Sequence, residues 1–198
     1  MNKKLQNQLF EKYPTIFREK DEPENKSCMS WGIECGDGWY DIIDTLCQSF
    51  MECYQTGFRV DPQDQNIVDG ETFFTVLPPK VIATQVKEKF GILRFYYRLE
   101  YDERLNKLEK TDRYPDIKEI KSGYNFYIDG MVHFAEILTS KTCEFTGKVG
   151  EIHVSGGSRG GWYKVLNRDY AKTDPKFVER GYVPVADLPK RVDNYSSE

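Results

Sequence analysis

The sequence contains no long apolar run, no surplus of positive charge and few cysteines. No segment approaches the roughly 18 apolar residues of a membrane span, and the polar start MNKKLQNQLF lacks the apolar stretch of a secretory signal. The net charge is −4 at pH 7, so a protein that coats nucleic acid through many cations is not expected. Five cysteines form no dense framework, which suits a reducing compartment. We therefore expect a cytoplasmic protein without membrane contact.

What the chain does contain is typical of a globular domain. Its 198 residues are 39% hydrophobic and 30% charged, a balance that supports a single filled core. Aromatic residues make up 14% of the chain, and each can bury a large area. We expect residues 1–198 to form one α+β domain, an antiparallel sheet packed by helices, with a charged insert at 100–122 and a frayed tail at 190–198.

Apolar residues at steps of three or four predict helices at about 2–13, 38–55 and 126–140. A further short helix is expected at 103–110 within the charged insert. The apolar face of the second helix comprises Trp39, Ile42, Ile43, Leu46, Phe50 and Tyr54. The core-facing side of the third helix is expected to comprise Tyr127, Met131, Phe134, Ala135 and Leu138.

The segment KVIATQVKEKFGILRFYYRLEY predicts a β-hairpin with Phe90-Gly91 as its turn. Alternating side chains then separate into two faces. The core face is expected to hold Ile82, Val86, Leu93, Phe95, Tyr97 and Leu99. The other face is expected to hold Gln85, Lys87, Lys89, Arg94, Tyr96 and Arg98. Further strands are expected at 58–60, at 72–77 and on both sides of the Gly/Ser loop 155–161.

The cationic face of this hairpin is the best functional candidate. Arg can bind phosphate or carboxylate oxygens through two parallel hydrogen bonds, and Lys binds them as a point charge. A ligand-binding site would use Gln85, Lys87, Lys89, Arg94 and Tyr96, with the tyrosine ring able to stack on a base. The other interpretation is a solvated outer sheet face, where alternating polar residues are common.

The segment WGIECGDGWYD offers a second set of site residues in front of the second helix. A tight turn around Asp37 at a helix N-terminus could hold an anion, with Trp31 and Trp39 beside it. Asp37 or Asp41 could instead act as a base or bind a metal. The structural interpretation makes Asp37 a helix cap and both tryptophans core residues. If this segment meets the cationic face in space, the two sets form one site.

Cysteine and glycine patterns leave weaker alternatives open. Cys28 and Cys35 are compatible with a disulfide or a metal site, and a Cys–His hydrolase would need a histidine base beside a cysteine. The loop 155–161 could cradle phosphate, but it lacks the Lys-Ser/Thr ending of a P-loop. A flexible hairpin tip is the simpler interpretation of that loop.

Long ordered segments of the chain resemble a known family. These segments are KYPTIFRE, CMSWGIECGDGWYDIIDTLC, QVKEKFGILRFYYR and TCEFTGKVG…GGWYKVL. They are similar to a family of small bacterial and bacteriophage proteins that has no established activity. The similarity spans residues 10–55, 80–98 and 127–171. It implies a phage origin and a C-terminal hairpin of zinc-ribbon type at 143–170.

The resemblance also implies four zinc ligands in that hairpin, as two Cys-x-x-Cys or Cys-x-x-His pairs. At the four positions this chain has Cys143, Thr146, Asn167 and Tyr170. One thiolate cannot hold zinc alone, so no metal and no other cofactor is expected.

Without the four zinc ligands, the hairpin could be stabilised in two ways. A rebuilt metal site would combine Cys143 with His153 or Asp169. The simpler expectation is a metal-free hairpin held by the side chains Phe145, Ile152, Trp162 and Tyr163.

No complete catalytic constellation is recognisable in the sequence. The resemblance and the cationic face together predict a non-enzymatic binding protein encoded by a phage. It would work in the host cytoplasm, where it sequesters an anionic, nucleotide-like ligand or blocks a host defence or regulatory protein. One alternative is a phosphodiesterase or other hydrolase that uses Asp37 or Asp41. A further alternative is a nucleic-acid-binding module, and the oligomeric state stays open.

Overall fold

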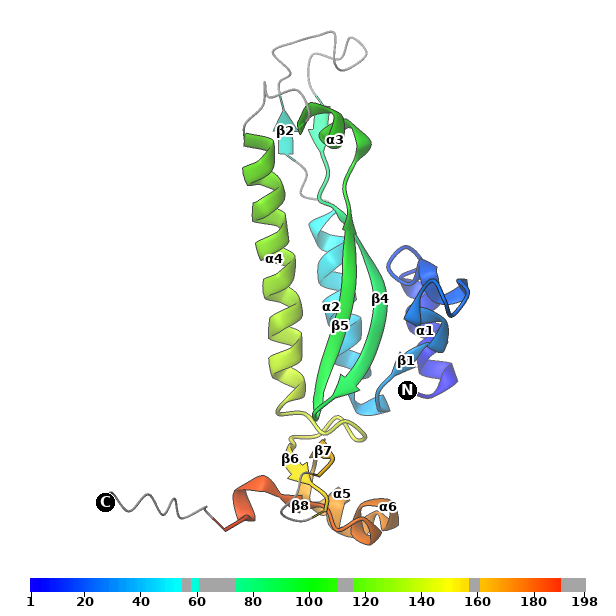
Figure 1. Ribbon diagram of the computed structural model, residues 1–198, viewed down its shortest axis with the longest axis vertical. Helices are drawn as coiled ribbons and strands as arrows, with labels where there is room; N and C mark the ends of the chain where they lie inside the picture. Colours follow the sequence, from blue (N-terminus) through cyan, green and yellow to red (C-terminus); the bar gives the residue numbers. More distant parts are fainter. Residues whose placement is uncertain (55–57, 61–73, 110–115, 157–160, 190–198) are drawn as a thin grey trace, which may run out of the picture.

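The hairpin and the helices around it organise the fold, which is α+β as expected. The computed structural model of the protein describes residues 1–54, 58–60, 74–109, 116–156 and 161–189. Helix α2 lies behind the hairpin β4–β5, the long helix α4 runs alongside β5, and α1 lies beyond the other edge of the sheet (Figure 1). A smaller unit of short strands and helices sits at the hairpin tip (Figure 1).

The N-terminal helix forms where its spacing predicts it. Helix α1 spans Lys3–Lys12, and the Asn2 side chain caps it by accepting a hydrogen bond of 3.0 Å from the Leu5 amide. Leu9 and Phe10 are buried on its inner side. Two 3₁₀ helices follow, η1 at Arg18–Asp21 and η2 at Cys28–Trp31. These elements cover the edge of the main sheet.

The second predicted helix is also confirmed. A 3₁₀ turn, η3 at Asp37–Trp39, leads into α2 at Tyr40–Cys53. The buried residues of α2 are Ile43, Leu46, Cys47, Phe50 and Cys53. They pack against the hairpin and α4, where the rings of Phe50 and Phe95 lie 5.8 Å apart between centroids. This contact is part of the main hydrophobic core.

The hairpin has the predicted turn and most of the predicted register. Strands β4 (Lys80–Lys89) and β5 (Ile92–Glu100) pair antiparallel, with Lys87 opposite Arg94 and Gln85 opposite Tyr96. A short strand that the sequence did not reveal, β1 at Ile33–Glu34, pairs parallel with β4. The sheet order is therefore β1-β4-β5.

One residue of the hairpin was assigned to the wrong face. An irregularity between Ala83 and Gln85 shifts the pairing, so Ile82 lies opposite Arg98 rather than on the face of Val86. Such a bulge inserts one extra residue and reverses the alternation beyond it. The Ala83 amide donates to the Ile16 carbonyl at 2.9 Å at this point. Ile82 is fully buried, on the face expected to be polar.

The far end of the hairpin leads to the charge-rich region. Strands β2 (Phe58–Val60) and β3 (Phe74–Val76) pair antiparallel, which confirms both short strands. Helix α3 spans Glu103–Glu109, close to the expected 103–110. The charged insert was expected to extend to residue 122. Its last part is instead helical, because α4 already begins at Asp116. The frayed tail expected at 190–198 lies outside the described residues.

Helix α4 is confirmed as a helix, but of the residues expected on its core-facing side only Met131 and Ala135 pack on the core. It spans Asp116–Thr139, so it starts ten residues earlier than expected. Its buried residues are Ile117, Tyr124, Ile128, Val132, Ala135 and Thr139. Of the expected core residues, Tyr127, Phe134 and Leu138 are instead exposed. Apolar residues lie on both sides of this helix, so their spacing alone could not show which side is buried.

The C-terminal unit consists of a three-stranded sheet and two short helices. Strands β6 (Glu151–Val154), β7 (Tyr163–Leu166) and β8 (Val183–Pro184) pair in the order β7-β6-β8. Helices α5 (Arg168–Thr173) and α6 (Pro175–Glu179) follow β7, and a 3₁₀ turn, η5, closes the unit at Val185–Asp187. Across the described segments, every helix is too short or too polar to traverse a lipid bilayer.

Candidate functional site

The hairpin turn carries an unusual residue for its geometry. Phe90 has φ 57° and Gly91 has φ 80°, the combination found in two-residue turns that favour Asn-Gly. Within the described segments, Phe90 is the only residue other than glycine with positive φ. A bulky residue in this region is strained. The residue is nevertheless 66% exposed, so burial of its side chain does not explain why a phenylalanine occupies the turn.

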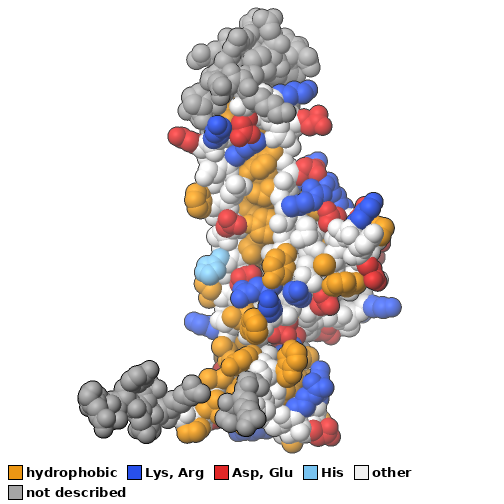
Figure 2. Space-filling model, in the orientation of Figure 1, with side chains coloured by type: hydrophobic (Ala, Val, Ile, Leu, Met, Phe, Trp, Pro, Cys, Tyr) orange, Lys and Arg blue, Asp and Glu red, His pale blue; other side chains and the backbone are white. Residues whose placement is uncertain are grey.

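The predicted cationic set does share one side of the hairpin. The pairs Lys87–Arg94 and Gln85–Tyr96 lie directly opposite each other across β4 and β5, and Lys89 is opposite Ile92. Opposite residues of an antiparallel pair project to the same face. Basic side chains gather over the lower half of the hairpin (Figure 2).

Three members of this face are already engaged within the protein. Arg94 forms an ion pair of 2.8 Å with Glu136 of α4, and the Gln85 amide donates to Glu34 at 3.3 Å. Arg98 pairs with Glu19 at 2.9 Å. These side chains connect the hairpin to α4, to β1 and to η1. Their main role in the described structure is to hold elements together.

The two lysines of the face differ from these residues. Lys87 Nζ lies 5.6 Å from the ring centroid of Tyr96, and Lys89 Nζ lies 5.4 Å from that of Phe90. Neither lysine has a carboxylate partner among the residues the structure describes. Both aromatic residues are exposed, Tyr96 by 42% and Phe90 by 66%. Lys87, Lys89, Phe90 and Tyr96 therefore form a patch that we call the tip patch.

The WGIECGDGW segment does not contribute Trp31, Trp39 or Asp37 to the tip patch. Trp31 is 52% exposed and lines a hollow of about 540 Å³ against α1. Trp39 is fully buried, and its indole N–H donates to the Thr142 carbonyl at 2.8 Å. Both Asp37 carboxylate oxygens accept hydrogen bonds from Asn2. Within the described residues, this segment meets the cationic face through β1, where Glu34 lies beside Lys87 and accepts a hydrogen bond from Gln85.

Gly36 and Gly38 of this segment make a close backbone contact that the sequence did not reveal. The Gly38 amide donates to the Glu144 carbonyl at 2.8 Å. A β-carbon at Gly38 would overlap the Cys143 carbonyl oxygen and would lie 2.8 Å from the Thr146 nitrogen. A β-carbon at Gly36 would likewise overlap the carbonyl oxygen of Glu144. The two glycines therefore allow the segment to dock on the CEFTG turn, more than a hundred residues away.

The C-terminal hairpin is held by aromatic packing, but only one expected residue takes part. Phe145 stacks on Tyr170 at 6.0 Å and contacts Phe177 at 5.1 Å between ring centroids. Tyr170 thus occupies an expected zinc-ligand position with a packing role. By contrast, Ile152, Trp162 and Tyr163 are 37%, 80% and 40% exposed, so their assignment to the packing was wrong. The local apolar cluster forms instead around Leu166, Ala171 and Phe177.

Two more of the expected zinc-ligand positions hold residues with structural roles. Asn167 caps α5 by accepting from the Tyr170 amide at 3.3 Å, and it donates to the Val149 carbonyl at 3.0 Å. Cys143 is fully buried. Within the described segments, no group of three or more His, Cys, Asp or Glu residues is arranged to hold a metal ion.

A partly buried ion cluster joins the hairpin to the C-terminal unit. Lys164 of β7 contacts Glu88 of β4 at 2.6 Å and Glu144 at 2.8 Å. The Glu144 side chain is only 3% exposed and also accepts from the Gly36 amide at 3.0 Å. Burial raises the pKa of Glu144, although Lys164 opposes this effect. No sequence motif pointed to this cluster, because its members come from three distant segments.

The burial of the cysteine side chains can be tested with a thiol reagent. No disulfide links the five cysteines, and Cys28 alone is partly exposed while the other four are buried. Burial raises the pKa of Cys35 to about 12 and that of Cys47 well above its usual value, so their reactive thiolates are scarce. We expect a thiol reagent to modify a single cysteine rapidly in the native protein and all five after denaturation. Rapid labelling of a Cys28→Ser variant would contradict this burial.

Comparison with known proteins gives no independent evidence for a family or a function. Searches with the chain against protein-family models, curated proteins and solved structures found no match. The resemblance noted in the sequence therefore stays a prediction.

Proposed function

We propose that the protein is a non-enzymatic binding protein that holds an anionic, nucleotide-like ligand on the tip patch. One observation carries this proposal: Lys87 and Lys89 lie over exposed rings and have no carboxylate partner among the described residues. The arginines of the same face are engaged by glutamates. The two lysines are therefore the cations of this face best placed to meet an external anion.

The chemistry of the tip patch suits a ligand with a planar part and a charged part. Exposed aromatic rings stack on nucleobases with about 1–3 kcal/mol per base. Lysines bind phosphate as point charges. A ring from Tyr96 or Phe90 beside an ammonium group supplies both contacts. A strained residue at an exposed position is a recurrent feature of binding sites, and this supports a binding role for Phe90.

A protein partner is the second candidate, since further aromatic surface lies close to the turn. The Gly91 turn packs on the backbone of Lys164 in β7, and Trp162 just before this strand is 80% exposed. Exposed Trp, Tyr and Phe side chains are enriched in protein interfaces. With the phage origin that the resemblance implies, such a partner would be a host defence or regulatory protein.

Binding is tested by substitutions that separate ligand contact from stability. We expect Lys87→Ala and Lys89→Ala each to weaken binding of a retained nucleotide about tenfold. Phe90→Asn should weaken it by a similar factor and, by relieving the turn, stabilise the fold by about 1 kcal/mol. Lys172→Ala removes an exposed lysine elsewhere and should change neither property. Titration of each variant with a panel of linear and cyclic nucleotides measures these effects.

The same panel distinguishes the other functions. Unchanged nucleotide recovered after denaturation supports sequestration, whereas a hydrolysed product would support the phosphodiesterase alternative with Asp37 or Asp41. Absence of any nucleotide-dependent thermal shift, together with co-purification of one host protein that Phe90→Asn releases, would replace the anionic ligand with the protein partner. Wild-type binding by all three patch variants would show that the tip patch is not the site.

A further inference from the structure

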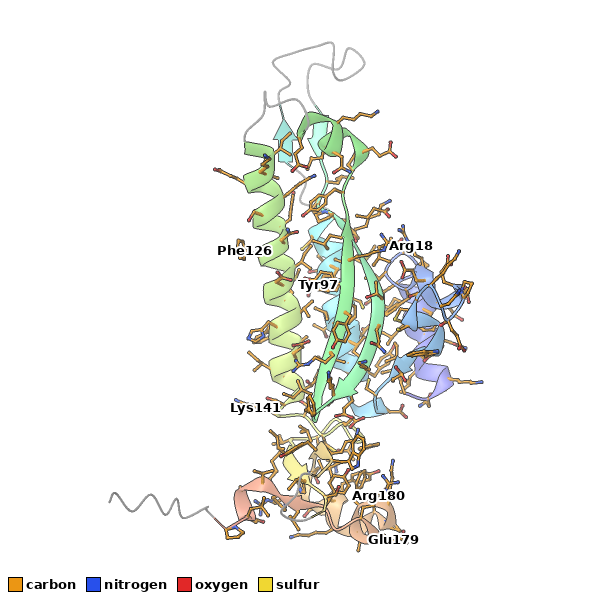
Figure 3. The ribbon with its side chains drawn as sticks, in the orientation of Figure 1. Arg18, Tyr97, Phe126, Lys141, Glu179 and Arg180 are labelled. Carbon is orange, nitrogen blue, oxygen red and sulfur yellow. The ribbon has the colours of Figure 1, made fainter. Side chains whose placement is uncertain are left out.

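The outer side of α4 is an apolar surface that no described element covers. Five of its large side chains are 40% to 74% exposed: Phe126, Tyr127, Phe134, Ile137 and Leu138. The Phe126 ring projects from α4 away from the rest of the molecule (Figure 3). Contiguous apolar surface of this kind on a soluble chain marks a contact surface.

Two glycines interrupt this helix on the same outer side. Gly123 and Gly130 are seven residues apart, two turns along α4, and a β-carbon at either position would meet no atom within 4 Å. Glycine is among the least favourable residues inside a helix. Nothing within the monomer requires these two. A helix surface without side chains at its centre allows the backbone of another helix to approach closely.

The residues on this side are arranged symmetrically about Gly130. Phe126 and Phe134 lie four residues before and after it, and Tyr127 and His133 lie three before and after. In a two-fold antiparallel pair of helices that cross at Gly130, Phe126 of each copy therefore meets Phe134 of the other. A two-fold interface requires this kind of self-complementarity.

The charges at the two ends of the surface fit the same arrangement. Glu119 lies eleven residues before Gly130, and Lys141 lies eleven after it, beside the C-terminal end of α4. Both are exposed, and neither has an ion-pair partner within the segments that the structure describes. In the antiparallel pair, Glu119 of each copy faces Lys141 of the other.

The available area matches what a dimer needs. An aromatic side chain contributes about 150–250 Å² when fully exposed, so the exposed parts of the five side chains amount to about 500 Å² per copy. Two copies would bury about 1,000 Å², the size at which specific interfaces begin. From these observations we infer that the protein forms a two-fold dimer through antiparallel α4 helices that cross at Gly130. This dimer is independent of the proposed ligand site.

Solution mass measured by light scattering over a range of concentrations tests the dimer. We expect wild type to dimerise and Phe126→Glu to weaken the dimer at least about tenfold. Gly130→Gln should also weaken it while improving helix propensity, so its failure to dimerise cannot be attributed to unfolding. Glu119→Lys should weaken the dimer, and Glu119→Lys with Lys141→Glu should restore it.

Cysteine pairs test the register directly. In a Cys28→Ser background, Gly130→Cys lies on the two-fold axis and should form an intermolecular disulfide on mild oxidation, because the two α-carbons come within about 7 Å. Gly123→Cys is the matched control, since it faces Ile137 and should not cross-link. A wild-type monomer at every concentration would overturn the inference. So would a dimer that Phe126→Glu and Gly130→Gln leave intact, or one that cross-links through Gly123→Cys alone.

Discussion

Alanine at Gly38 is expected to destabilise the protein by about 3 kcal/mol, because the added methyl group overlaps a neighbouring backbone. The atoms in its way are the Cys143 carbonyl oxygen and the amide nitrogens of Thr146 and Gly147. None of these belongs to a flexible side chain that could move aside. The hydrogen bond from the Gly38 amide to Glu144, 2.8 Å long, would be disturbed as well. Denaturant unfolding of the variant measures the loss.

Gly123→Ala is the matched control for this substitution. A β-carbon there meets nothing within 4 Å, and alanine is a better helix former than glycine by about 1 kcal/mol. In dilute, monomeric protein, the same chemical change should therefore stabilise the fold at Gly123 and destabilise it at Gly38. If Gly38→Ala were as stable as wild type, the close docking of the GDG segment on the CEFTG turn would be refuted.

Replacing Lys164 with methionine is expected to have a comparable effect. The substitution leaves the Glu144 carboxylate, 3% exposed, without its positive partner. A buried charge left alone typically destabilises a fold by about 3–5 kcal/mol. Glu144→Gln in the same chain should restore most of the lost stability, because the buried group is then neutral. Lys148→Met, at an exposed lysine of the same unit, should leave the free energy of unfolding nearly unchanged.

The pH dependence of the Lys164→Met variant follows from Glu144. Burial already raises the pKa of this carboxyl above its ordinary 4.5 in the wild-type protein, and loss of Lys164 removes the influence that opposes the rise. In the folded variant the proton is therefore held at a higher pH than in the unfolded chain. The destabilisation should be largest at neutral pH and should diminish as the pH falls through the raised pKa. A deficit independent of pH would mean that Glu144 does not cause it.

The ion cluster and the glycine contact together join segments that lie far apart in the chain. Glu144 receives the Gly36 amide through its side chain and the Gly38 amide through its carbonyl. Lys164 then ties Glu144 to Glu88 near the hairpin turn. The C-terminal unit therefore contacts the hairpin turn that carries the tip patch. Loss of that contact should weaken ligand binding at the tip as well as stability.

Several features were predictable because they depend on neighbours in the sequence. The hairpin register and its Phe90-Gly91 turn follow from alternation over a few residues, and both are present. Helices α1 and α2 follow from apolar residues at helical spacing with a cap or glycine nearby. The common side of Lys87, Lys89 and Tyr96 follows from the same alternation.

Other features were not predictable because they depend on segments that meet only in the folded chain. The buried side of α4 was misassigned in part, since a helix with apolar residues all round gives no preference until β5 and α2 cover one side. Ile82 changed face because the register shifts between Ala83 and Gln85, next to the point where the Ala83 amide donates to the Ile16 carbonyl. Arg94 and Arg98 looked available for a ligand, yet Glu136 and Glu19 neutralise them from elsewhere in the chain.

The sequence by itself thus determined the α+β class, the hairpin and the side on which its cations lie, because periodicity is a local property of the chain. Only the tertiary structure decided which of those cations stay available to a ligand, because an ion pair depends on distance in space. It also decided that Asp37 anchors Asn2, that Trp39 is core and that Tyr170 packs on Phe145. The apolar outer side of α4 became visible for the same reason, since exposure is known only when every neighbour is in place.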